Sequence, residues 1–179
     1  GKWPIQNDST ITTKGLTWSI SDLLQGSPYQ ERFTGGVFTH SFLDVNDYHR
    51  FHVPVAGTVV EARNIPGRVM MDVVKRADGS FHVVDGTGYQ FTQDRALLVI
   101  DSPLGLVAVL PIGMAQVSSV NLTAQVGAEL RKGEEFGYFA FGGSDIVPLY
   151  EAGRVHLDAT VGTHYNQGRR IGHAQLASP

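Results

Sequence analysis

Short apolar runs separated by turn-forming residues occur along most of the chain and predict a protein made mainly of β-strands. Val, Ile, Thr, Phe and Tyr are concentrated in these runs, and Gly, Pro, Asn or Asp bound them. The number of runs favours a β-sandwich or closed sheet. The predicted strands are Gly36–Phe42, Val55–Ala62, Met70–Val74, Phe81–Val84, Ala96–Asp101, Leu106–Ile112, Val117–Thr123, Phe136–Phe141 and Ile146–Tyr150.

Helix signals are few, so we expect only a few peripheral helices. A short helix over residues 19–24, with Ser19 or Ser21 as N-cap, and a turn over residues 46–49 are weakly periodic. By contrast, Asp78-Gly79 between two apolar runs is a strong hairpin signal, because glycine adopts a positive φ without steric cost.

Two glycine-containing segments, residues 53–59 and 126–134, look like the turns of lipoyl-type barrel-sandwich modules. No low-complexity linker separates them. We therefore expect one barrel-sandwich-like domain over residues 1–179.

Composition narrows the functional classes. The 179 residues are 42% apolar and 17% charged, with a formal net charge of −3, which fits a globular domain. No Lys or Arg block of the kind that binds nucleic acid is present. The absence of cysteine excludes a disulfide framework and thiolate metal sites.

Location is constrained only in part by the sequence. No apolar run approaches the roughly 20 residues of a membrane span, so we expect a soluble or peripheral membrane protein in the cytoplasm. The sequence begins at Gly1 without an initiator Met or a signal-peptide core, and we expect upstream sequence to be missing.

Three segments carry candidate chemistry: residues 47–52, residues 141–145 and the turn at residues 132–134. Each also has a purely structural explanation. His49 and His52, with Asp47 nearby, have the residue types of a metal site, or are a helix-end cap and a core histidine. Gly142-Gly143-Ser144 is equally a tight turn between strands. It is not a serine-hydrolase elbow, because residue 146 is Ile where that motif requires Gly.

Taken together, these segments resemble the phosphatidylserine decarboxylases. The matching motifs are Tyr48-His49-Arg50-Phe51-His52-x-Pro54, the later turn Lys132-Gly133-Glu134-Glu135-x-Gly137-Tyr138-Phe139, and Phe141-Gly142-Gly143-Ser144, in the family's order. The resemblance extends through Lys14–Ile20, Asp22–Leu24 and Pro111–Met114.

The resemblance implies that an inactive precursor cuts itself between Gly143 and Ser144, giving chains 1–143 and 144–179. Ser144 would become a pyruvoyl group, which captures a substrate amine as a Schiff base; no metal or pyridoxal phosphate is expected. By similarity, His52 would be the base that activates Ser144, and His49 would protonate the carbanion left by decarboxylation.

The family's base is oriented by an aspartate in a segment ahead of the Lys-Gly-x-x-Tyr/Trp-Ser stretch. No such motif is present after Gly1, and Asp8 is a poor substitute. We expect this aspartate to lie upstream of Gly1; the other explanation is a chain that cuts itself inefficiently.

Phosphatidylserine is the family's usual substrate and the first expectation here. Val117-Ser118-Ser119 and Asp145 depart from the phospholipid-acting pattern of Val-Gly-Ser-Thr and a Thr after the cleavage serine. A free aromatic amino acid such as tryptophan is therefore the alternative substrate. An uncut, non-catalytic barrel-sandwich binding module is the alternative of another class, and a lipoyl carrier at Lys132 is less favoured. Membrane contact and homo-oligomer formation stay open.

Overall fold

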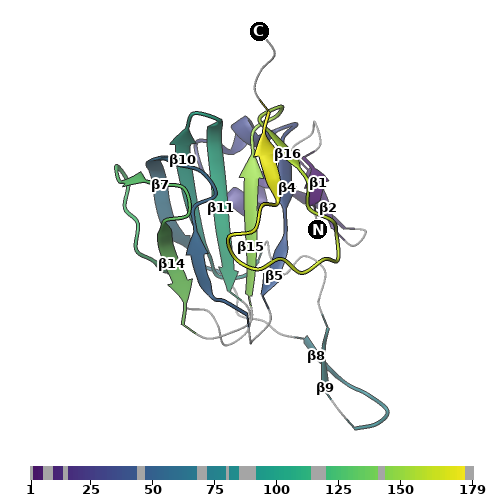
Figure 1. Cartoon of the computed structure of the whole chain (residues 1–179). Coiled ribbons are helices and arrows are strands. Elements are labelled where there is room, and N and C mark those ends of the chain that lie inside the picture. Colours follow the sequence, from purple (N-terminus) through teal and green to yellow (C-terminus); the bar gives the residue numbers. More distant parts are fainter. Residues whose placement is uncertain are drawn as a thin grey trace.

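Two antiparallel sheets pack against each other in the computed structural model (Figure 1). The structure describes residues 2–5, 10–13, 16–43, 47–67, 72–79, 81–84, 92–113, 120–140 and 144–175. The larger sheet has the order β1 (Lys2–Pro4), β4 (Val37–Thr39), β15 (Ser144–Tyr150), β11 (Gly105–Gly113), β10 (Arg95–Ser102), β7 (Gly57–Ile65) and β13 (Glu129–Leu130), and β5 (Ser41–Leu43) also pairs with β15.

The smaller sheet has the order β12 (Val120–Leu122), β14 (Glu135–Phe139) and β6 (Arg50–His52). Three two-stranded hairpins lie outside both sheets: β2 (Thr10–Thr13) with β3 (Leu16–Ser19), β8 (Asp72–Lys75) with β9 (Phe81–Val84), and β16 (Val155–Leu157) with β17 (Gly172–Ala174). The described helices are α1 (Ile20–Leu24) and the 3-10 helix η1 (Gln30–Phe33). The predicted class, mainly β with a sandwich-like core and peripheral helices, is confirmed.

The central strands β10 and β11 are buried on both faces, which explains their continuous apolar sequences. On β10, Leu97 and Val99 belong to a core shared with α1, whereas Leu98 and Ile100 belong to a second core shared with the smaller sheet. Because successive strand residues point to opposite faces, one apolar run fills both cores.

Each of the nine predicted strands overlaps an observed one, although boundaries differ. The run predicted over Gly36–Phe42 is divided at His40 into β4 and β5, both of which pair with β15. Residues 70–71, 117–119 and 141 of the predicted strands lie outside the described residues. The helix over residues 20–24 is confirmed. The turn predicted over residues 46–49 appears as a bend at Asp47 followed by irregular chain, and Asn46 lies outside the described part.

The predicted hairpin at Asp78-Gly79 is confirmed between β8 and β9, where Gly79 has a φ of +84°. Figure 1 shows this hairpin projecting from the sandwich. The segment 126–134 turns at residues 126–127 and 132–133, and it pairs with the other glycine-containing segment, residues 53–59. Val53 exchanges backbone hydrogen bonds with Gly133 and Glu134, and Val59 does so with Gly127 and Ala128.

Arg95 ties helix α1 to the larger sheet. Its guanidinium is buried and donates hydrogen bonds to the carbonyl oxygens of Asp22 at 2.7 Å, Leu23 at 2.8 Å and Gln93 at 2.9 Å. Burial, with a smaller contribution from the positive charge of Arg63, lowers the pKa of Arg95 to about 10. A charged arginine in this position satisfies carbonyls that the short helix leaves without intrahelical partners.

No helix among the described residues is long and apolar enough to cross a membrane.

We predict that Arg95→Met lowers the free energy of unfolding by about 2–4 kcal/mol, because it leaves several buried carbonyl oxygens without donors. Urea denaturation followed by circular dichroism measures this change. Arg131→Met is the control, since the Arg131 side chain is 96% exposed. Equal effects of the two substitutions would contradict the anchoring role of Arg95.

Candidate functional site

Ser144 is the first residue of β15 and lies between two neighbouring strands. It pairs with Gly113 of β11 on one side and with Leu43 of β5 on the other. The strand therefore begins two residues before the predicted Ile146. Gly142 and Gly143 lie outside the described residues. Figure 1 shows that β15 begins at the end of the sandwich where β5, β11 and β14 finish.

His49 lies at this same end, just before β6. Its carbonyl oxygen accepts a hydrogen bond from Phe139 N–H at 3.0 Å, and its ring meets the Phe139 ring edge-on at 6.2 Å. Its Nδ1 lies 2.6 Å from the carbonyl oxygen of Asp47, so Nδ1 is the donor there. His49 thus sits beside the end of β14, from which the chain continues toward Ser144.

His52 lies at the opposite end of β6, where it pairs with Glu135 at the start of β14. Its Nδ1 is 2.8 Å from the carbonyl oxygen of Gly133, and its Nε2 is 2.7 Å from the hydroxyl of Tyr48. The Tyr48 and His52 rings stack with centroids 5.6 Å apart. The two histidines of the motif are therefore held separately, with His49 closer along the sheet to the end of β14.

The turn at Lys132-Gly133 explains how His52 is oriented. A carbonyl oxygen only accepts hydrogen bonds, so Nδ1 of His52 carries a proton, and in the neutral ring Nε2 accepts from the Tyr48 hydroxyl. Gly133 has a φ of +82°, a conformation that side-chain-bearing residues rarely adopt, and its N–H donates to Val53. The Gly133 carbonyl thus orients the His52 ring, a role that the family resemblance implies for an aspartate.

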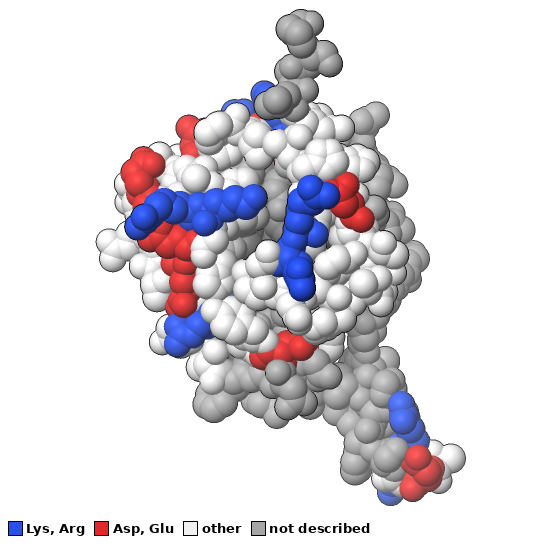
Figure 2. All heavy atoms as spheres, viewed as in Figure 1, with Lys and Arg blue, Asp and Glu red and all other residues white. Residues whose placement is uncertain are grey.

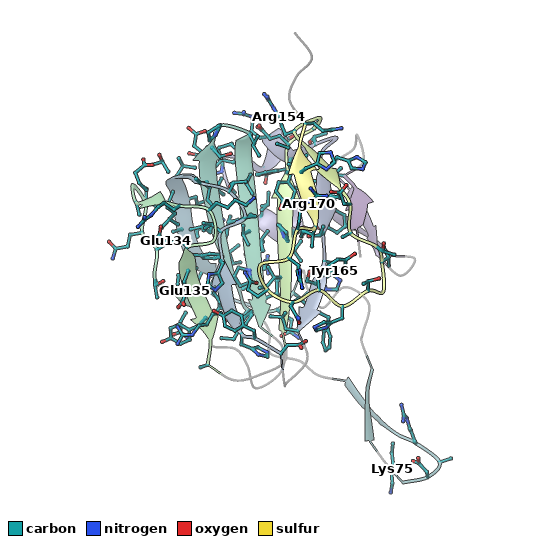
Figure 3. All side chains as sticks on the ribbon, in the orientation of Figure 1. Lys75, Glu134, Glu135, Arg154, Tyr165 and Arg170 are labelled. Atoms are coloured by element: carbon teal, nitrogen blue, oxygen red, sulfur yellow. The ribbon has the colours of Figure 1, made fainter. Side chains whose placement is uncertain are left out.

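Charges around the smaller sheet are paired rather than gathered in one patch. Arg50 lies 2.6 Å from Glu135, and its guanidinium stacks over Tyr138 at 5.6 Å. Figure 3 shows Glu134 and Glu135 beside β14, and Figure 2 shows acidic and basic side chains next to one another there. Aromatic side chains are nevertheless exposed, with Phe42 57% and Tyr48 48% accessible.

A buried carboxyl group next to Ser144, which faces a histidine, was not among the residues predicted from the sequence. Asp145 has no solvent exposure, and its Oδ1 lies 2.9 Å from Nε2 of His40, whose side chain is 19% exposed. The sequence did contain a signal for it, since Asp145 stands near the start of the otherwise apolar strand β15. A carboxylate buried in such a strand requires a partner. Asp145 stood out from the sequence only as a departure from Thr.

A second cluster of ionisable side chains lies around the C-terminal hairpin of β16 and β17. Asp158 lies 3.0 Å from Nδ1 of His173, 3.7 Å from Nε2 of His156 and 3.8 Å from Nε of Arg170. The hydrogen bond from His173 is the main cause that lowers the pKa of Asp158. Across the described ranges, no three His, Asp or Glu side chains are grouped as metal ligands, and this includes His49, His52 and Asp47.

Comparison with known proteins gives a family match over nearly the whole chain. The family model described as phosphatidylserine decarboxylase matches residues 2–173. A rice (Oryza sativa subsp. japonica) phosphatidylserine decarboxylase proenzyme 2 is 32% identical over 157 residues, 87% of this chain and 24% of the relative. A Chlamydia trachomatis serovar D phosphatidylserine decarboxylase proenzyme is 32% identical over 162 residues, 89% of this chain and 52% of the relative.

An L-tryptophan decarboxylase from Psilocybe cubensis is 29% identical over 154 residues, 79% of this chain and 35% of the relative. The chain thus spans between 24% and 52% of the length of these relatives.

We predict that neutral His52 carries its proton on Nδ1, the less common tautomer of free histidine, because only a donor satisfies the Gly133 carbonyl. Nitrogen-15 chemical shifts of the imidazoles, recorded above the titration range of the histidines, measure this directly. His164, exposed and with Nε2 3.2 Å from Oδ1 of Asn166, serves as the reference for a donating Nε2. A His52 spectrum of the Nε2–H type would contradict the orientation described.

Proposed function

Because the chain belongs to the phosphatidylserine decarboxylase family, we propose that it is the core of a pyruvoyl-dependent decarboxylase, a carboxy-lyase that cuts itself between Gly143 and Ser144. One observation of the fold carries this proposal. Residue 144 starts a strand that is paired on both sides, with Gly113 and Leu43. Pairing on both sides would keep β15 in the sheet after the peptide bond preceding residue 144 has been broken.

Self-cleavage would produce chains of residues 1–143 and 144–179. In the first step the Ser144 hydroxyl gives up its proton to a base and its oxygen attacks the Gly143 carbonyl carbon. The bond from that carbon to the Ser144 nitrogen breaks, which leaves an ester and a protonated amine. Elimination then releases the Gly143 carboxylate and leaves dehydroalanine, which water converts to pyruvoyl with loss of ammonia.

His52 is the proposed base for this step on the strength of the family resemblance, although it lies at the end of β6 that is farther from Ser144. It can accept a proton only at Nε2, since Nδ1 donates to the Gly133 carbonyl, and Tyr48 contacts that Nε2. Tyr48 therefore governs when Nε2 is available.

A pyruvoyl group at residue 144 would supply the electron-withdrawing carbonyl that decarboxylation of a primary amine requires. The protein must then return a proton to the substrate carbon. His49 is the proposed donor, because imidazole exchanges protons near neutral pH and His49 lies beside the end of β14.

Phosphatidylserine is the proposed substrate, on the strength of the family. A free aromatic amino acid is the second candidate, supported by the tryptophan-decarboxylating relative and by Asp145 after the cleavage serine. The exposed rings of Phe42 and Tyr48 suit an apolar or aromatic substrate group in either case. Assay of carbon dioxide release from phosphatidylserine vesicles and from free tryptophan separates the two.

We predict that denaturing mass spectrometry of the full-length protein shows two chains divided at Gly143–Ser144. The smaller chain is expected to begin with a keto group and to gain mass when a substrate amine and cyanoborohydride are added. Ser144→Ala is expected to stay whole and to gain no adduct. A single uncut wild-type chain that traps no amine would contradict the proposal and favour a binding module.

The two histidines are predicted to act at different stages. His52→Ala should slow self-cleavage by about 10²- to 10⁴-fold, because the serine loses its base. His49→Ala should be cut normally but lose decarboxylation by a similar factor. Time courses of chain division and of carbon dioxide release measure the two stages, with His164→Ala as the control. Slow cutting in His49→Ala, or normal cutting in His52→Ala, would contradict the assignment.

A further inference from the structure

We infer that the His40–Asp145 pair is a clamp that positions residue 144 before and after the chain is cut, an inference that rests on the proposed function. Asp145 follows the cleavage serine directly, and its buried Oδ1 lies 2.9 Å from Nε2 of His40. Both side chains are positioning residues in this inference, since neither is assigned a part in proton transfer.

The position of His40 in the fold explains how the pair can hold the beginning of β15. His40 stands between β4 and β5, and both of these strands pair with β15. Strand β4 pairs with the end of β15, at Leu149 and Tyr150, whereas β5 pairs with its beginning, at residues 144–146. The contact therefore fixes the bend between β4 and β5 against the first residues of β15.

The pair lies on the face of β15 that is turned away from the smaller sheet. Asp145 pairs with Ile112, and Ile112, Val147 and Leu149 all belong to the core shared with α1. Ile146 packs against the other core, the one shared with the smaller sheet. Since His49 and His52 belong to the smaller sheet, the pair acts through the strand backbone and not as a base.

The two facing atoms lie 2.9 Å apart without hydrogen-bond geometry, so their contact is an electrostatic one between a buried carboxyl group and an imidazole. A carboxylate with no solvent exposure is costly unless a donor or positive charge faces it, and removing the partner costs more than the intact pair contributes. Small displacements of the beginning of β15 would separate the two groups. The pair thus favours one position of the strand over its alternatives.

The His40–Asp145 contact is expected to contribute more to the position of residue 144 after the chain has been cut. Before the cut, residue 144 is held by its peptide bond to residue 143; afterwards it is the free end of a strand, and strand ends tend to open. Asp145 is the next residue, so its contact with His40 acts on that end directly. A reacting group that moves by about 1 Å can lose two orders of magnitude in rate.

The test compares Asp145→Asn, His40→Ala and His40→Gln with Val99→Ala as control. Val99 is buried in the same core, on β10, which does not pair with β15. The Val99→Ala variant therefore measures the effect of a general loss of stability. Gln places an amide nitrogen where the Nε2 of His40 lies and is expected to restore most of the effect lost in Ala. Two readouts are needed.

The first readout does not depend on activity. Amide hydrogen exchange, followed by mass spectrometry, should quicken by about tenfold at residues 145–146 and 41–43 in Asp145→Asn and His40→Ala, a local opening of the kind that exchange detects. Peptides from β10 should remain protected. Unchanged exchange at residues 145–146, or equal acceleration in Val99→Ala, would overturn the clamp even if the wild type is never cut.

The second readout concerns the cut protein. In Asp145→Asn and His40→Ala, kcat should fall by about tenfold with KM unchanged, and the double variant should be no worse than either single variant, since the two side chains act as one unit. Additive losses would overturn the pair. An uncut wild type would instead contradict the proposed function, and the exchange result would still decide the clamp.

Discussion

The structure depends on the burial of β10 and β11 on both faces. Their alternating side chains supply two cores at once, one with α1 and one with the smaller sheet. Only a strand paired on both edges can be buried in this way without leaving backbone groups unsatisfied. This requirement explains why β15 pairs with β11. The register of that pairing places residue 144 opposite Gly113.

The smaller sheet depends on the same second core. Phe51 and Phe136 are buried in it with ring centroids 5.2 Å apart, and the register between β6 and β14 shifts at Phe136, between Glu135 and Gly137. Because successive strand residues point to opposite faces, His52 faces away from the buried Phe51, whereas His49, two residues before Phe51, meets the same Phe139 ring as Phe51 does. The Lys132-Gly133 turn then completes the arrangement by presenting a carbonyl to His52.

Much of this architecture follows from local sequence, because β10 and β11 are continuous apolar runs and Gly79 marks its own hairpin. The predicted candidate residues also follow from motifs, Ser144, His49 and His52 among them. What the sequence does not reveal is pairing between distant segments. His52 and Gly133 are 81 positions apart, and β13 is a strand of two residues that exists only because it lies beside β7. The His40–Asp145 contact joins distant segments in the same way.

Division of the chain at residue 143 is compatible with this fold for a topological reason. The segment that follows contains β15, whose hydrogen-bonding partners β4, β5 and β11 all belong to the segment before it. The strand is therefore inserted inside the larger sheet rather than attached at its edge. Its burial on both faces, including Val147 and Leu149 toward α1, would hold two such parts together without a covalent link. What the sheet restrains less well is the free end itself, and that is where Asp145 and its partner are placed.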